Sequence, residues 1–161
     1  GVDFAAVGVF TMIPSVASFL FLNVAGWTTD KLISHGMDVT FVRKLMQAIG
    51  FGGGALVLAV VGYVQSPMMA IALMSFGSMV GAFALGGWGS NHMDLAPRHA
   101  GTLMGITNTA GTVPGIIGVF VSGLILEWTG SWILVFQVAA AINVFGLVFY
   151  LIFASTKKQF D

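Results

Sequence analysis

The stretch Trp132–Ala154, WILVFQVAAAINVFGLVFYLIFA, contains no Asp, Glu, Lys or Arg. An α-helix rises about 1.5 Å per residue, so roughly 20 apolar residues are enough to cross a hydrocarbon layer about 30 Å thick. The stretch is long enough and apolar enough to do this. It therefore predicts a transmembrane helix.

The composition of the whole chain also indicates that lipid, rather than water, surrounds the protein. Charged residues make up 7% and hydrophobic residues 57% of the sequence, and the mean hydropathy is +0.97. Soluble domains carry roughly 25% charged residues, so six basic and six acidic side chains cannot cover a water-facing surface. The charges balance and form no basic patch, which argues against a nucleic-acid partner. Cysteine is absent, which excludes disulfides and thiolate metal sites.

Four further stretches meet the requirement for crossing a membrane, and turn-forming residues separate them. The gaps are short, so neighbouring helices must be antiparallel. The sequence predicts an all-α membrane protein with five transmembrane helices. Transport folds are often assembled from helix triplets, so an odd number of spans predicts one further helix before Gly1. The predicted spans are 7–26, 45–64, 67–89, 101–125 and 132–154.

All basic residues fall on one side of this topology, because they occupy only the first connection, the third connection and the segment after the last span. An excess of Lys and Arg is typical of cytoplasmic loops or their equivalents in organelles. We therefore assign this side to the cytosol-equivalent face. The residues are Lys31, Arg43, Lys44, Arg98, Lys157 and Lys158.

The fourth span carries a stripe of small and polar residues. Gly105, Asn108, Thr112 and Gly115 recur at intervals of three or four and share one face of a helix. Pro114 predicts a kink or local unwinding beside them. Such a stripe either packs against a neighbouring helix or borders a wet substrate pathway, and both readings stay open. No span has a charge at its middle, so the cation that an anion-binding site needs must lie outside this chain.

The first connection contains a candidate gate. We expect Gly26 to end the first helix, which leaves Asp30 and Lys31 in a loop at the membrane surface. Asp30 could then accept hydrogen bonds from the start of an adjacent helix. The alternative is an ordinary solvated loop.

The third connection contains the second candidate gate. We expect Asn91, His92 and Asp94 to finish the third helix, and Pro97 to occupy the first turn of the fourth with Arg98 inside it. Asp94 and Arg98 are then near enough to pair with each other or with charges on another element. The alternative is that Arg98 only reaches the lipid headgroups. The histidines of this segment have no third ligand in reach, so no metal site is predicted.

Three blocks of this region resemble the tenth and eleventh helices of the anion:cation symporter family within the major facilitator superfamily. The residues at Gly26, Asp30 and Lys31 resemble a loop motif of the superfamily, and Val42–Leu45 and Phe153–Ser155 also fit the family. The three blocks are NHMDLAPRHAG (Asn91–Gly101), LMGITNT (Leu103–Thr109) and VPG (Val113–Gly115).

The resemblance implies that residues 1–161 are helices eight to twelve of a twelve-helix carrier, part of its C-terminal six-helix bundle without the first helix. It implies anion transport by alternating access. Phosphate is the expected substrate, in preference to glutamate, sialate, ascorbate or nucleotides. The coupling ion would be Na⁺ or H⁺, and no other cofactor is expected. The partners would be the N-terminal half and the lipid of a plastid envelope, Golgi, other organelle or plasma membrane.

A second hypothesis is a membrane scaffold or assembly subunit, in which the glycine-rich faces serve only helix association. A membrane enzyme is not expected, because no span pairs two acidic residues or places a nucleophile beside a base. A scaffold and a carrier share the same composition, so composition alone leaves both hypotheses open.

Overall fold

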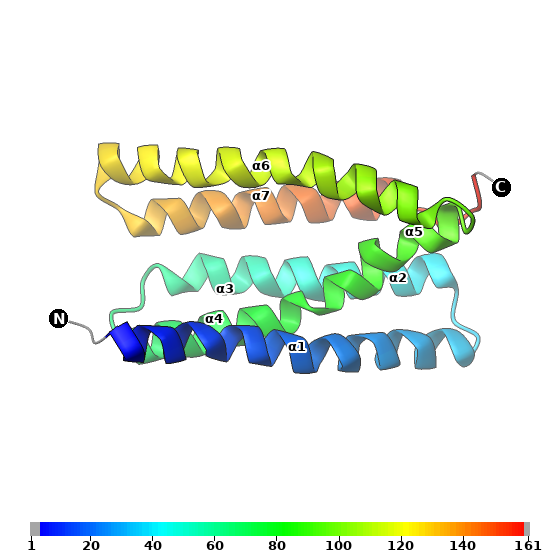
Figure 1. Cartoon of the computed structure of the whole chain (residues 1–161), viewed down its shortest axis with the longest axis horizontal. Coiled ribbons are helices and arrows are strands. Elements are labelled where there is room, and N and C mark those ends of the chain that lie inside the picture. The colour runs from blue at the N-terminus through cyan, green and yellow to red at the C-terminus, as the bar shows by residue number, and fades with distance from the viewer. Residues whose placement is uncertain (1–3, 160–161) are drawn as a thin grey trace.

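The computed structural model describes residues 4–159, with side chains from Met12 onward. Figure 1 shows helices arranged as antiparallel rods, two of which are interrupted by a short π-helical turn. Five of these rods are long and apolar enough to cross a membrane, which confirms the predicted all-α class with five spans. The elements are α1 (Phe4–Ser34), α2 (Val39–Gln47), η1 (Ala48–Gly52), α3 (Gly53–Val61), α4 (Pro67–Gly81), η2 (Leu85–Gly89), α5 (Ser90–Leu95), α6 (Ala100–Thr129) and α7 (Trp132–Phe153).

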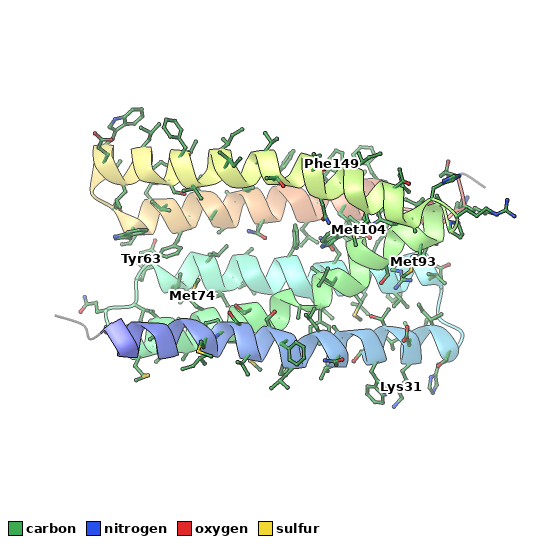
Figure 2. All side chains as sticks on the ribbon, in the orientation of Figure 1. Lys31, Tyr63, Met74, Met93, Met104 and Phe149 are labelled. Atoms are coloured by element: carbon green, nitrogen blue, oxygen red, sulfur yellow. The ribbon has the colours of Figure 1, made fainter. Side chains whose placement is uncertain are left out.

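The exterior of the bundle is apolar. Leu56, Val119 and Phe145 expose 71%, 78% and 72% of their surface, and large apolar side chains project outward along the rods (Figure 2). Soluble monomers rarely expose apolar patches of this extent, whereas in a bilayer such side chains meet lipid. The chain is therefore an integral, multi-pass membrane protein.

The rods are packed unequally. α1 packs along α4, α3 contacts both α4 and α7, and α2 packs against η2. α6 contacts α5 and α7 and carries no buried residue. Figure 1 shows α6 and α7 as a pair, with the other rods on the side of α7 away from α6. The interior is therefore built mainly by the second and third rods.

Glycines allow the second and third rods to cross closely. A Cβ placed on Gly50 would lie 2.6 Å from the backbone nitrogen of Ala84, and one on Gly77 would lie 3.0 Å from Val57 Cγ1. In lipid, helices associate through van der Waals contact between closely approaching backbones. These two glycines hold the rods at a distance that a larger residue would increase.

The first helix is longer than predicted. The prediction that Gly26 ends it is wrong, because α1 continues to Ser34. The chain turns instead at Gly36, whose φ of +87° suits glycine. α2 then begins early, because the Asp38 side chain accepts a hydrogen bond from the Phe41 backbone nitrogen at 2.8 Å and caps the helix. A polar sequence at a membrane surface can thus stay helical.

The two prolines near and inside α6 also differ from expectation. Pro97 does not occupy the first turn, and Arg98 is not inside the helix, because α6 begins at Ala100. The backbone of Ala96 is not helical (φ −151°, ψ 81°), because the clash with a following proline disfavours the helical conformation. α6 continues through Pro114 without interruption. The predicted local unwinding at Pro114 does not occur, because one missing hydrogen bond does not disrupt so long a helix.

Candidate gate at the basic end

The α1–α2 turn, the α5–α6 turn and the segment after α7 meet at one end of the bundle, the right-hand end in Figure 1. The Thr40 and Thr156 hydroxyls lie 2.7 Å apart, and the Gln159 backbone nitrogen donates to the Leu95 carbonyl at 2.9 Å. We call this the basic end. It holds all of the lysines and arginines, as the topology predicts: Lys31, Arg43, Lys44, Arg98, Lys157 and Lys158.

An ion pair joins Arg43 on α2 to Asp94 on α5. Arg43 Nε donates to Asp94 Oδ2 at 2.8 Å, and Nη2 donates to Oδ1 at 3.2 Å. Nη1 donates to the Gly86 carbonyl at 3.1 Å. The two side chains are only 10% and 19% exposed. A bidentate contact of this kind fixes the orientation of both partners as well as their distance, so it holds the ends of the second and third rods in one register.

Helical spacing explains why these side chains face each other. Arg43 and Gln47 are four residues apart on α2, and Gly87, Asn91 and Asp94 follow a similar spacing on η2 and α5. A Cβ on Gly87 would lie 2.8 Å from Gln47 Oε1 and 2.9 Å from the Arg43 carbonyl oxygen. Glycine at this position therefore makes room for the polar side chains. We call these five residues the polar seam.

The polar seam contains buried groups that lack hydrogen-bond partners. Gln47 Oε1 and Asn91 Oδ1 have no partner among the described residues, and neither has the Tyr150 hydroxyl on α7. Gln47 is 2% and Asn91 9% exposed. Tyr150 lies within electrostatic range of both Arg43 and Asp94. A buried polar group without a partner costs about 1–3 kcal/mol, so the seam is less stable than an apolar contact of the same size.

A second polar contact links α5 to α6. His92 Nε2 lies 3.0 Å from the Thr107 hydroxyl oxygen, and His92 Nδ1 lies 3.1 Å from the Gly89 carbonyl oxygen. His92 is 9% exposed, and the Trp88 ring stands nearly perpendicular to it with the centroids 5.8 Å apart. The histidine is therefore held on both sides of its ring, and its orientation is fixed.

The predicted residues of the third connection divide into two groups. Asn91, His92 and Asp94 do finish the third rod and lie together at the basic end. Arg98 is exposed in the turn before α6, and the partner of Asp94 is Arg43 rather than Arg98. The sequence left open whether Asp94 pairs with Arg98 or with a charge on another element, and the structure shows the second arrangement. Helical packing brings α2 against α5, while Pro97 and the turn separate Arg98 from the seam.

The predicted residues of the first connection do not join this site. Gly26, Asp30 and Lys31 lie on α1, and all three are exposed. Lys31 Nζ lies 4.7 Å from the centroid of the Trp27 ring on the same helix, and Figure 2 shows Lys31 pointing away from the bundle. Their proposed gating role remains a prediction.

The predicted pathway residues lie on the open face of α6. Gly105, Asn108, Thr112 and Gly115 are all exposed, and no atom lies within 4 Å of a Cβ placed on either glycine. The Thr112 hydroxyl donates to the Asn108 carbonyl at 2.9 Å. Thr112 and Gly115 line an open hollow of about 670 Å³ whose other walls are apolar. The described part of the chain packs nothing against this stripe, so its pathway role also remains a prediction.

Sequence reasoning missed Arg43 as the partner of Asp94 and assigned it only to the topology. The sequence carried only a weak signal, because Arg43 is one of several polar residues in a short amphipathic helix and their spacing does not show which of them is packed. No group of three or more His, Cys, Asp or Glu side chains that could hold a metal occurs in the part of the chain that the structure describes.

Comparison with known proteins finds relatives along nearly the whole chain, although no protein-family model matches it. The chain is 40% identical over 154 residues to the chloroplastic ascorbate transporter of Arabidopsis thaliana, which covers 96% of this chain and 28% of that protein. It is 38% identical to the chloroplastic sodium-dependent phosphate transport protein 1 of the same plant, with 96% and 30% covered. It is 36% identical to sialin of Homo sapiens, with 94% and 32% covered. The chain thus spans less than a third of the length of these relatives.

Proposed function

The chain belongs to the anion:cation symporter family of the major facilitator superfamily, and on this basis we propose that it forms part of a secondary active carrier of small anions. The observation that carries the proposal is the similarity to named transporters of ascorbate and phosphate over 96% of the chain. The five apolar rods supply the membrane-spanning architecture that such a carrier needs.

In this proposal the five rods are helices eight to twelve of a twelve-helix carrier, and the N-terminal half of the same protein packs against them. Relatives about three times as long as this chain support that arrangement. Transport then proceeds by alternating access, in which one six-helix half rocks against the other around a site near the middle of the membrane. The open face of α6 is the surface that we assign to that site.

Phosphate is the substrate that we propose, and ascorbate is the second candidate. The phosphate transport protein and the ascorbate transporter are 38% and 40% identical to this chain, and both names place those proteins in the chloroplast. We accordingly propose a plastid envelope as the membrane. The coupling ion is Na⁺ or H⁺, and the sodium dependence in the name of the phosphate relative favours Na⁺. No enzymatic activity is proposed.

The Arg43–Asp94 pair is the gate in this mechanism. A carrier needs contacts that stabilise one conformation and break in the other, because only a difference in free energy between the states can shift their populations. The pair is bidentate and mostly shielded, yet it lies at the end of the bundle where water can replace it. Both residues lie in this half, so the pair acts within it: formed, it holds the ends of α2 and α5 together, and broken, it lets them separate and changes the surface that this half presents to the other at the cytosol-equivalent side.

The deciding experiment is uptake of labelled anions by proteoliposomes that contain the full-length carrier. Phosphate, ascorbate, glutamate and sialate would be compared under an imposed Na⁺ gradient, an imposed H⁺ gradient and no gradient. We expect phosphate uptake that depends on the Na⁺ gradient. Correctly inserted protein that carries none of these anions would contradict the proposal and support the membrane scaffold instead.

The pathway role of α6 has its own test, Asn108→Leu. Because Asn108 is exposed and contacts no other rod among the described residues, the variant should fold and insert normally while uptake falls at least about tenfold, which is the effect of losing roughly 1.4 kcal/mol of binding. Phe145→Leu on the lipid-facing side of α7 is the matched control and should transport normally. Unchanged affinity and rate in Asn108→Leu would remove this residue from the pathway.

A further inference from the structure

The Tyr150 hydroxyl is a hydrogen-bond donor buried beside the Arg43–Asp94 pair. It lies on α7, near the end of that helix at Phe153, and no described residue accepts its hydrogen. Both charges of the pair act on it electrostatically. A buried polar group without a partner is unfavourable. The conformation with the pair formed therefore leaves a donor unused next to a carboxylate that Arg43 already occupies.

Contacts from the segment after α7 keep the Tyr150 side chain close to the pair. The hydroxyl of Thr156, further along the same segment, lies 2.7 Å from the hydroxyl of Thr40 on α2. The Gln159 backbone nitrogen donates to the Leu95 carbonyl at 2.9 Å, and Leu95 directly follows the carboxylate residue of the pair on α5. These two contacts limit how far the ends of α2 and α5 can move from the end of α7. The phenol thus stays within reach when the rods shift.

Breaking the pair leaves the Asp94 carboxylate in need of a donor. Its side chain is only 19% exposed, and a shielded charge that has lost its partner is strongly destabilising. The Tyr150 hydroxyl can supply that donor, because a hydrogen bond to an ionised acceptor is shorter and roughly twice as strong as one between neutral groups. The amide oxygens of Gln47 and Asn91 are also buried acceptors, but they are neutral and lose nothing when the pair breaks.

We propose that Tyr150 is a positioning residue of the gate, which donates to Asp94 when Arg43 leaves and so stabilises the conformation with the pair broken. Its hydroxyl has no partner in one conformation and a charged partner in the other, and both effects bring the two conformations closer in free energy. A contact that must break and re-form in every cycle requires this balance. The role in transport rests on the proposed carrier function, whereas the exchange of partners is a property of this half alone.

Thermal unfolding of the full-length carrier in detergent tests the exchange of partners without requiring transport. In the wild type, Tyr150→Phe removes a hydroxyl without a partner, so the unfolding midpoint should rise by about 2 °C. In Arg43→Met, where the hydroxyl takes over as donor to Asp94, the same substitution should lower the midpoint by at least as much. With both charges removed, in Arg43→Met/Asp94→Leu, it should raise the midpoint again.

A second measurement follows the two conformations directly. Spin labels on cysteines at Phe41 and Met93, which are exposed on α2 and α5, would be compared in nanodiscs in a full-length carrier without other cysteines. Tyr150→Phe should reduce the fraction of molecules with widely separated labels at least about tenfold, because the broken pair loses its stabilising bond. This measurement decides by itself if Arg43→Met does not reach the membrane.

Tyr63→Phe is the matched control. Tyr63 is the other tyrosine of the chain and is 62% exposed in the turn after α3, so its substitution should change neither the midpoints nor the label distances. Effects of Tyr150→Phe with the same sign in all three backgrounds, or unchanged label distances, would overturn the proposal. A lower midpoint in the wild type would also overturn it, because the hydroxyl would then have a partner while the pair is formed.

The outcome also separates this proposal from the carrier function. If the exchange of partners holds while no anion is transported, the role of Tyr150 stands and the carrier function fails. If transport is present while the exchange of partners is not, the carrier function stands and the role of Tyr150 fails.

Discussion

Arg43 and Asp94 bring opposite charges into a region where each is mostly shielded from water. An ion pair in such a place is worth little net stability, because desolvation offsets much of the attraction, but losing one partner leaves the other charge stranded. The pair therefore contributes more to the free-energy difference between two conformations than to the stability of the fold as a whole. Arg43 also donates to the Gly86 carbonyl, so its planar guanidinium makes three contacts at once. The single ammonium nitrogen of a lysine could not reproduce this arrangement.

The first prediction concerns Asp94→Asn. We expect uptake by the full-length carrier to fall at least about tenfold while the protein still reaches the membrane, and the folded state to lose about 3 kcal/mol because the Arg43 charge loses its partner. Glu127→Gln is the matched control, because Glu127 is an exposed carboxylate near the other end of α6. Uptake by Asp94→Asn equal to that of the wild type would exclude the gate.

The second prediction concerns Gln47→Met, which replaces a buried amide by an apolar side chain of similar length. Gln47 Oε1 has no partner among the described residues, so the substitution should raise the free energy of unfolding by about 1 kcal/mol. Thermal unfolding in detergent measures it, with Gln137→Met as the control that should destabilise, because Gln137 Nε2 donates to the Ala59 carbonyl at 2.8 Å. A loss of stability in Gln47→Met would mean that the amide has a partner, such as an ordered water.

At the scale of the elements, the close crossing of the second and third rods depends on single glycines. The third prediction is that Gly50→Ala destabilises the fold by about 1–3 kcal/mol, because its Cβ would lie 2.6 Å from the Ala84 backbone, which cannot move alone. Gly54→Ala, one turn along the same rod, meets nothing within 4 Å and should be neutral or slightly stabilising. Thermal unfolding of the pair tests this, and equal effects of the two substitutions would contradict it.

The number and type of helices could be predicted because membrane thickness sets the length of an apolar stretch. Their ends could not. Thr28, Thr29 and Asp30 are polar, yet they continue α1, since a helix that leaves the lipid can keep its own hydrogen bonds. The sequence predicts that the first helix ends at Gly26, whereas the chain turns at Gly36. Only the backbone conformation distinguishes a glycine that turns the chain from one that does not.

The candidate site was partly predictable for a related reason. Asn91, His92 and Asp94 are polar residues within one turn and a half of a helix end, which a sequence displays directly. Their partners Arg43 and Thr107 lie 51 and 15 residues away from Asp94 and His92, and only packing brings them together. Local spacing predicts which side chains share a face, whereas the pairing of faces belongs to the fold.

At the scale of the whole molecule, the fourth prediction concerns topology. Single cysteines at His35 and Lys157, in a full-length carrier without other cysteines, should react with a membrane-impermeant thiol reagent from the same side of a sealed vesicle. A cysteine at Gln65 should react from the opposite side, because Gln65 lies in the turn between α3 and α4. This chain contributes no native cysteine to the background. Labelling of His35 and Lys157 from opposite sides would contradict the five-span topology.

Polar contacts between rods are concentrated at one end of the molecule. Arg43 with Asp94, His92 with Thr107, Thr40 with Thr156 and Gln159 with Leu95 all lie there. Toward the opposite end, the described residues have the bond from Gln137 Nε2 to the Ala59 carbonyl at 2.8 Å, together with tight turns and apolar packing. A harsh, short-chain detergent should consequently separate the rods first at the end that holds the Gln65 and Gly130 turns. In partly unfolded molecules the rods would then still be joined at the basic end.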